Sequence, residues 1–181
     1  EDSNTDTITI TVTPVSDLPI ANNQSVTAVE DSSNNAVTLT ATDADNDTLT
    51  YTIVVQPAHG TLSGTAPNLA YTPNSNFPYT NVNGTDYFTF KTNDGTEDSN
   101  TATITITVTP VSDLPIANNQ SIIVGEDSSN NAVTLTATDA DNDTLTYTIV
   151  VQPTHGTLSE TTPNLVYTPT PNFPSTNANG T

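Results

Sequence analysis

Three aspartates at alternate positions are the residues of this chain best suited to chemistry. Asp43, Asp45 and Asp47 stand in the stretch 41–53, which reads ATDADNDTLTYTI and returns unchanged at 137–149. Directly after the aspartates, apolar and polar residues alternate, which is typical of a β-strand. A loop that concentrates carboxylates at the start of a strand is suited to binding a cation together with other oxygen ligands.

Other chemistry is not indicated by the sequence. An EF-hand calcium loop beginning at Asp43 would require Gly at position 48 and Glu at position 54, where the chain has Thr48 and Val54. His59 and His155 each stand alone in a Pro-x-His-Gly turn, and no nucleophile elbow or phosphate loop occurs. We therefore expect turn histidines and no enzymatic activity.

The charge balance restricts the partners. The 181 residues include one Lys+Arg against 20 Asp+Glu, a formal net charge of −19, and no cysteine. Nucleic acid and anionic membranes are not expected as partners because no basic surface is available, whereas cations are favoured. No apolar run is long enough to span a membrane. Only 33% of the residues are hydrophobic, so a disordered linker is the alternative that the strand pattern below argues against.

The chain repeats itself with an offset of 96 residues. Residues 1–85 align with residues 97–181, and 72 of these 85 positions are identical. Two full periods would need 2 × 96 = 192 residues, and the 11 that are missing correspond to residues 86–96. Repeats this similar indicate an array extended by duplication, and we expect the chain to be a segment of a longer polymer.

Period-two alternation predicts the strands. Residues 5–13 and 101–109 alternate Ile or Val with Thr, which predicts a half-buried strand in each copy. The remaining strands of the first full repeat are predicted at residues 25–29, 36–41, 48–55, 61–63, 69–72 and 87–91. Seven short strands in about 95 residues, without helical periodicity, favour an antiparallel immunoglobulin-like sandwich.

Proline-bracketed junctions divide the chain into three expected parts. Pro14 and Pro19, and their counterparts Pro110 and Pro115, make these junctions extended and stiff. Residues 1–13 would be the last strand of a preceding repeat, and residues 14–110 a complete repeat. Residues 111–181 would be a second repeat, truncated before its last two strands.

The motifs together resemble a known family. ATDADNDTLTYTI resembles the cadherin pattern in which an Asp-Ala-Asp calcium motif leads into a strand, and TNDGTEDSNTATITITVTPVSDLPIA resembles the last cadherin strands and their linker. The order VSDLP, EDSS, TDADND, HGTLS, YTP, NGTDYFTF and NDG is similar to that of the bacterial cadherin-like repeats called tandem-95. This resemblance implies an all-β fold of tandem seven-stranded Greek-key immunoglobulin- or cadherin-like β-sandwiches.

The resemblance also implies Ca²⁺ at the junctions. Between the two repeats it implies four ligands, Glu30, Asp113, Asp139 and Asp141. Before the first full repeat it implies four more, Asp17, Asp43, Asp45 and Asp94. The linker VSDLP holds fewer acids than a cadherin linker, and the Asp-Arg-Glu motif has no counterpart, since Asp86 is out of register. These departures predict fewer and more weakly bound ions, with solvated loop acids as the alternative.

We expect a structural role from this resemblance. It implies an extracellular or cell-surface stalk, adhesin extender or biofilm filament of bacterial origin, stiffened by Ca²⁺ and built from neighbouring repeats or head-to-tail copies. The alternative is an adhesive module that binds surface glycans or a receptor. A third hypothesis is strand donation, in which residues 5–13 of one copy pair with the incomplete second repeat of another.

Overall fold

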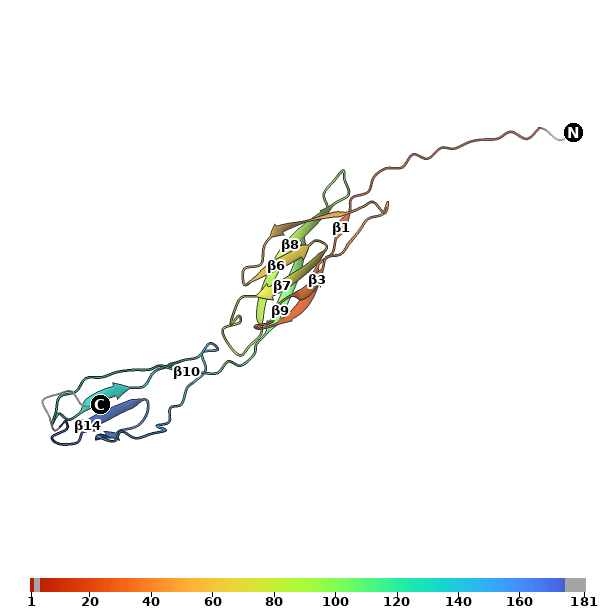
Figure 1. Cartoon of the computed structure of the whole chain (residues 1–181). Helices are drawn as coiled ribbons and strands as arrows, with labels where there is room; N and C mark the ends of the chain where they lie inside the picture. The colour runs from red at the N-terminus through yellow and green to blue at the C-terminus, as the bar shows by residue number, and fades with distance from the viewer. Residues whose placement is uncertain (2–3, 175–181) are drawn as a thin grey trace. The chain divides into compact units, whose positions relative to one another are not determined.

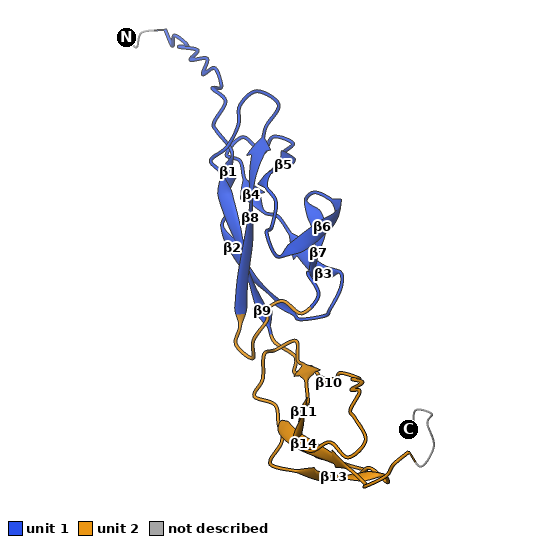
Figure 2. Cartoon of the chain, turned by 90° about the vertical axis from the view of Figure 1, so that its left-hand side faces the viewer, with its two compact units in different colours: residues 1–75, 84–109 blue, residues 76–83, 110–181 orange. Residues whose placement is uncertain are grey.

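A computed structural model describes residue 1 and residues 4–174 of the chain (Figure 1). Its described residues form strands and no helix, and none of them forms a helix long and apolar enough to cross a membrane. Two compact units are present: unit 1 comprises Glu1–Ser75 and Gly84–Thr109, and unit 2 comprises Asn76–Asn83 and Pro110–Thr181 (Figure 2). The expected parts 1–13 and 111–181 include residues 2–3 and 175–181, which lie outside the described residues.

Unit 1 is a sandwich of two sheets. One sheet has four strands in the order β2-β9-β8-β5, and the other has three in the order β3-β7-β6. A short ribbon pairs β1 with β4. The strands are β1 (Ile20–Ala21), β2 (Gln24–Val29), β3 (Asn35–Thr38), β4 (Ala41–Thr42), β5 (Thr50–Val55), β6 (Gly60–Thr65), β7 (Asn68–Pro73), β8 (Gly84–Asn93) and β9 (Ala102–Thr109). The seven strands of the two sheets confirm the predicted all-β sandwich.

One strand pair differs from the expected antiparallel arrangement. β2 and β9 run parallel, with Val26 opposite Ile106, whereas the other pairs of unit 1 are antiparallel. Parallel neighbours need a long connection, and here the rest of the unit supplies it. The prediction of antiparallel pairs throughout was therefore wrong at this edge, because alternation within a strand does not specify the direction of its partner.

The core of unit 1 forms between its two sheets. Four alternate residues of β9 are completely buried, namely Ala102, Ile104, Ile106 and Val108. Phe88 and Phe90 of β8 and Tyr71 of β7 are the largest buried side chains. The Thr residues between the apolar positions of β9 are half-buried on the other face. The alternation at residues 101–109 thus predicts the inward face of β9 correctly.

Unit 2 repeats only part of this arrangement. β10 (Ile116–Ala117) pairs with β12 (Ala137–Thr138), as β1 pairs with β4. β11 (Asn131–Thr134), β14 (Asn164–Pro169) and β13 (Gly156–Ser159) form a three-stranded sheet in the order β11-β14-β13. No four-stranded sheet forms among its described residues, which include no counterparts of β8 and β9. Residues 120–125 and 146–151, the counterparts of β2 and β5, belong to no strand.

The described residues before the first junction also lack a strand. Residues 4–13 belong to no strand, although their sequence predicts one. Ile8, Ile10 and Val12 are 87%, 82% and 85% exposed, whereas their counterparts in β9 are completely buried. β9 lies between β2 and β8 in the sheet, and residues 4–13 have no such neighbours. An alternating sequence becomes a strand only where a neighbouring strand offers hydrogen bonds and an apolar face.

Candidate metal centre

The aspartate loop of unit 1 lies between β4, which ends at Thr42, and β5, which begins at Thr50. One carboxylate holds its backbone, since Asp43 Oδ1 accepts the N–H groups of Asp45 and Asp47, both at 3.0 Å. Such side-chain to backbone bonds are a common way for Asp to form a turn. Asn46 has a φ of 61°, a left-handed conformation that Asn adopts more readily than most residues. The loop therefore folds through contacts within its own sequence.

Three carboxylates meet in this loop. Asp43, Asp45 and Asp47 each offer an oxygen within 4.8 Å of the others. Oδ2 of Asp43 is buried and has no hydrogen-bond partner among the described residues. Two like charges about 4 Å apart repel by about 1 kcal/mol in water and by more at a protein surface. The arrangement is therefore electrostatically unfavourable unless a cation shares the three carboxylates.

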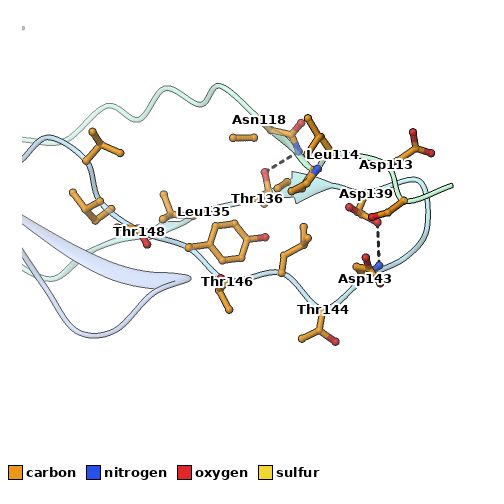
Figure 3. A pocket seen from close by; sticks show the side chains of 18 of the residues that line it. Asp113, Leu114, Asn118, Leu135, Thr136, Asp139, Asp143, Thr144, Thr146 and Thr148 are labelled. Atoms are coloured by element: carbon orange, nitrogen blue, oxygen red, sulfur yellow. Dashed lines mark hydrogen bonds between the residues drawn. The ribbon is translucent and has the colours of Figure 1, made fainter. Parts of the chain in front are cut away.

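Unit 2 contains the same geometry. Asp139 Oδ1 accepts the N–H groups of Asp141 at 3.0 Å and Asp143 at 3.1 Å, and the bond to Asp143 is visible in Figure 3. The carboxylates of these three residues again lie within 4.8 Å of one another. Asp141 is only 4% exposed, and its Oδ1 has no hydrogen-bond partner among the described residues. An identical loop thus forms an identical acidic cluster in each unit.

A linker aspartate is attached to each cluster through its backbone. The N–H of Asp17 donates to Asp45 Oδ2 at 2.8 Å, and the N–H of Asp113 donates to Asp141 Oδ2 at 2.7 Å. The linker and the loop are therefore held together in both units. The carboxylate of Asp17 is not part of the group formed by Asp43, Asp45 and Asp47.

Glu30 and Asp94 lie at opposite ends of unit 1. Glu30 follows β2, is 2% exposed, and donates its N–H to the carbonyl of Thr109, the last residue of β9, at 2.9 Å. Asp94 lies in the turn after β8, at the end where Thr50 pairs with Asn93. It is thus near the start of β5, although it is not one of the three grouped acids.

Asp94 is anchored by its own turn. Its Oδ1 accepts the N–H groups of Glu97 at 2.7 Å and Thr96 at 2.6 Å, and the Thr96 hydroxyl at 2.8 Å. The bonds from Glu97 and then Thr96 hold the pKa of the Asp94 carboxyl below its usual range. Its Oδ2 is buried without a hydrogen-bond partner among the described residues. Asp94 is therefore anionic at neutral pH and keeps one oxygen available.

Two members of the clusters were absent from the predicted ligand set. Asp47 and Asp143 share the clusters with the predicted Asp43 and Asp45, and Asp139 and Asp141. The available signal was the alternate spacing of the three aspartates, which a turn closed by the first carboxylate brings together. The resemblance to cadherins points only to the first two aspartates of each triplet.

Asp86, the acid that was out of register, has a structural role. It is 1% exposed, and its Oδ1 accepts the N–H groups of Ala58 at 3.0 Å and Tyr87 at 2.9 Å. Its Oδ2 accepts the N–H of His59 at 3.0 Å and the Tyr71 hydroxyl at 2.8 Å. Burial, followed by this bond to Asp86, raises the pKa of Tyr71 well above its usual range. With four donors already bound, Asp86 joins the two sheets.

The acidic clusters fit a hard divalent cation. Ca²⁺ takes six to eight oxygen ligands from carboxylates, carbonyls and water. Each cluster supplies three carboxylates and oxygens that no described hydrogen bond uses, including Asp43 Oδ2 and Asp141 Oδ1. No nitrogen or sulfur ligand stands among the grouped residues, which favours Ca²⁺ over zinc or copper. Three carboxylates alone leave coordination positions for water or further protein oxygens.

Comparison with known proteins places the chain in a family. Residues 16–107 and 112–179 each match the family described as Bacterial Ig domain, and together they cover most of the chain. No curated protein matches the chain. Both matched stretches contain an aspartate loop, so the candidate site recurs once in each.

Several solved structures are similar at low identity. The extracellular cadherin domains 3-6 of Protocadherin Gamma B2 are 18% identical with a TM-score of 0.49, over 84% of this chain and 38% of that one. Human CDH23 EC21-23 is 16% identical with a TM-score of 0.48, over 84% and 54%. The endo-fucoidan hydrolase MfFcnA4 of glycoside hydrolase family 107 is 21% identical with a TM-score of 0.43, over 85% and 24%. The chain thus spans about a quarter to a half of these proteins.

The family match covers both repeats and confirms the predicted bacterial immunoglobulin-like repeat. Domains of this family are typically non-catalytic and are typically found outside the cell or on its surface. With two consecutive matches across its length, the chain belongs to the family of bacterial Ig domains.

Proposed function

We propose that the chain is a spacer segment of an extracellular stalk, adhesin extender or filament, and that Ca²⁺ bound by the aspartate loops stiffens it. The role is mechanical: each sandwich acts as a rigid body, and the ion restricts bending at the junction. The observation that carries the proposal is the same three-carboxylate cluster in both units, each with a buried carboxylate oxygen that has no hydrogen-bond partner among the described residues.

The backbone bonds of the linker aspartates support a site at the start of each repeat. Asp17 and Asp113 donate their N–H groups to the central aspartate of the following cluster. A cation held by that cluster would fix the linker as well as the loop. Without a cation, mutual repulsion of the three carboxylates would weaken the same contacts.

The covalent chain supports a ligand from the preceding repeat. Glu30 is bonded to Thr109, and only four peptide units separate Thr109 from Asp113. Four extended residues span at most about 14 Å, so the chain itself keeps Asp113 within that distance of Thr109. In the proposed mechanism, Glu30 completes the coordination of an ion that the next repeat binds through its aspartate loop.

The energy available is comparable with the stability of a small domain. A ligand that binds only the folded state at a hundred times its dissociation constant stabilises that state by about 2.7 kcal/mol. The free energy of unfolding of a native protein is about 5–15 kcal/mol, so bound calcium would contribute a substantial part of it. Millimolar Ca²⁺ with a dissociation constant near 10 μM would reach this ratio.

Thermal unfolding in a chelator and in millimolar Ca²⁺ tests the proposal. We expect Ca²⁺ to raise the melting temperature and to narrow the range of interdomain distances in small-angle X-ray scattering. Asp139→Ala should lose the effect in unit 2, and Asp43→Ala in unit 1. Glu160→Ala is the matched control, because it removes one exposed charge outside both clusters. Equal shifts in Asp139→Ala and Glu160→Ala, or no shift in the unaltered chain, would contradict calcium binding at these loops.

A further inference from the structure

Unit 2 contains a piece of chain that is inserted between two strands of unit 1. Residues 76–83 follow β7 and precede β8, yet they belong to the same compact unit as Pro110–Thr181 (Figure 2). The chain therefore passes from one unit to the other at residues 75–76 and 83–84 as well as at residues 109–110. This segment, the inserted loop, is thus a part of unit 2 that the sequence of the first repeat supplies.

Two hydrogen bonds join the inserted loop to the aspartate loop of unit 2. Asn81 Nδ2 donates to Asp143 Oδ1 at 2.7 Å, and Asn142 Nδ2 donates to the carbonyl oxygen of Tyr79 at 3.0 Å. The first bond ends on a carboxylate, and hydrogen bonds to ionised acceptors are stronger than those between neutral groups. Each loop donates one bond and accepts the other. The pair of bonds therefore fixes the orientation of the two loops as well as their separation.

Both loops have a defined local conformation. Asn142 has a φ of 59°, a left-handed conformation that asparagine adopts more readily than most residues. In the inserted loop, the N–H of Thr80 donates to the carbonyl of Pro78 at 2.8 Å. Phe77 is buried, and its ring lies edge-on to that of Tyr79 with 6.1 Å between the centroids. Loops that are ordered in advance lose less conformational entropy when they bind each other.

Both halves of this contact occur twice in the sequence. Asn81 returns as Asn177, and the pair at 142–143 has an identical counterpart at 46–47. Each repeat therefore carries the residue types of an inserted loop and those of an aspartate loop. The contact is not restricted by sequence to one pair of repeats.

The two loops are attached to opposite ends of one strand in unit 1. The inserted loop directly precedes Gly84, the first residue of β8. The last residue of β8, Asn93, lies opposite Thr50 at the start of β5, which follows the aspartate loop. A repeat thus has one loop at each end of β8. This arrangement suits contacts that recur in one direction along an array, as in proteins whose repeats contact only their neighbours.

We propose that the inserted loop is a docking surface, and that its partner is the aspartate loop of the repeat that follows. The connection consists of the Asn81–Asp143 and Asn142–Tyr79 hydrogen bonds and acts in addition to the covalent linker. It does not rest on the proposed calcium binding, because protein amides are the donors of both bonds. Tyr79 contributes its backbone carbonyl, so its replacement by Ser175 in the second copy keeps the acceptor type.

Chymotrypsin cleavage after Tyr79 measures how often the inserted loop leaves its partner. Tyr79 is exposed, and the rate of cleavage follows the population of the open form when opening and closing are fast. Asn81→Ala combined with Asn142→Gly removes both donors, and glycine retains the left-handed conformation at position 142. In the presence of a chelator, we expect this double variant to be cleaved at least about tenfold faster than the unaltered chain.

Two matched controls distinguish docking from general loosening. Asn83→Ala changes an exposed asparagine of the same loop, whose side chain forms no hydrogen bond with a described residue. Asn46→Gly makes the same change in the identical aspartate loop of unit 1. Neither control should alter the rate of cleavage after Tyr79. An unchanged rate in the double variant, or equal acceleration by Asn83→Ala, would overturn the proposal. Because a chelator is present throughout, these outcomes do not depend on calcium binding, which the melting experiment tests separately.

A double-mutant cycle tests the assigned contact. Asp143→Ala keeps the aspartate loop closed, because the backbone N–H of Asp143 donates to Asp139 and its side chain is not needed for that bond. If Asn81 and Asp143 act through one hydrogen bond, Asn81→Ala should accelerate cleavage in the unaltered chain and have little further effect in Asp143→Ala. Equal acceleration by Asn81→Ala in both backgrounds would overturn this contact, since the two side chains would then act independently.

Discussion

Residues 50–55 and 146–151 both read TYTIVV, yet only the first forms a strand. In unit 1, β5 pairs with β8, so that Thr52 lies opposite Lys91 and Ile53 opposite Phe90. The described residues of unit 2 include no counterpart of β8. Identical sequence in an otherwise similar unit therefore gives different structure. The comparison shows that β-propensity becomes a strand only through a partner.

The aspartate loops, in contrast, have the same structure in both units. In both units the first aspartate of the loop accepts the N–H groups of the second and the third. The lengths of these bonds agree between the units within 0.1 Å. The ribbon before each loop also keeps its register. These features depend on residues close in sequence, so they form without the four-stranded sheet. A site built from such a loop can be duplicated along a chain without change.

The largest effect should come from removal of one aromatic ring, which should make β5 of unit 1 behave like residues 146–151 of unit 2. Phe90→Ala would leave a cavity between the sheets and remove the ring that stacks on Tyr51. Truncation of a buried Phe typically costs about 3–5 kcal/mol. We expect amide hydrogens in β5 to exchange nearly as fast as those of residues 146–151, as measured by NMR.

An exposed tyrosine of the same strand provides the control for this variant. Tyr87 lies on the outer face of the same strand and is 53% exposed. Tyr87→Ala should change stability by about 0.5 kcal/mol or less, as surface substitutions usually do. Slow exchange in β5 that survives Phe90→Ala would show that β5 does not depend on the β8 core contact.

Much of unit 1 follows from its sequence. The alternation at residues 101–109 predicts both β9 and its buried face, because every apolar residue there points to one side. It also predicts a strand at residues 5–13, where none forms, since alternation describes a face and not the presence of a partner. The parallel direction of β2 against β9 is likewise set by distant residues.

The candidate site was predictable to a similar extent. The spacing of Asp43, Asp45 and Asp47 places them in one loop, and the loop closes through its own backbone N–H groups. The hydrogen bond from the N–H of Asp17 to the Asp45 carboxylate was not predictable, because candidate metal ligands are chosen by their side chains. The position of Asp86 between the sheets depends on its hydrogen bonds to Tyr71 and to the turn at residues 58–59. The alternation of residue types within a strand does not predict that these distant residues come together.

The next largest effect should come from Asp86, which has no counterpart among residues 110–181. Asp86→Ala would leave three N–H groups without their acceptor, and the Tyr71 hydroxyl would keep only the carbonyl of His59, at 3.2 Å. Buried donors left unsatisfied cost about 1–3 kcal/mol each, less where water enters, so we expect a loss of about 3 kcal/mol in urea unfolding of unit 1. Asp86→Asn, which keeps one acceptor oxygen, should lose less. Equal losses would show that shape, and not hydrogen bonding, determines the role of this residue.

High pH should distinguish the two units through Tyr71. Its pKa in the folded state is raised by burial and by the bond to Asp86, so folding favours the protonated phenol. The resulting stability is complete below the unfolded value of about 10 and is lost as pH rises toward the folded pKa. At pH 11 the phenol stays protonated in the folded unit but is ionised in the unfolded chain, so the free energy of unfolding should be lower than at neutral pH by about 1.4 kcal/mol.

Alkaline unfolding of the unaltered chain and of Tyr71→Phe measures this linkage. The phenol absorbance should report one tyrosine that ionises together with the loss of unit 1 structure, and the variant should lack that step. Ionisation of all six tyrosines before any loss of structure would contradict a protected Tyr71.

The smallest effect should come from a single residue beside the turn between β6 and β7, which differs between the units. Gly64 has a φ of 89°, and its counterpart Glu160 has a φ of 70°. A side chain in this left-handed region costs about 1 kcal/mol, which glycine avoids. Glu160→Gly should therefore stabilise unit 2 by up to about 1 kcal/mol in thermal unfolding. Gly64→Glu should destabilise unit 1, where a Cβ would also lie 2.8 Å from the carbonyl oxygen of Asn68.

Glu160→Ala separates charge from conformation, because it removes the carboxylate and keeps the strain. If Ala stabilised unit 2 as much as Gly, repulsion between acids and not backbone conformation would explain the difference at this turn.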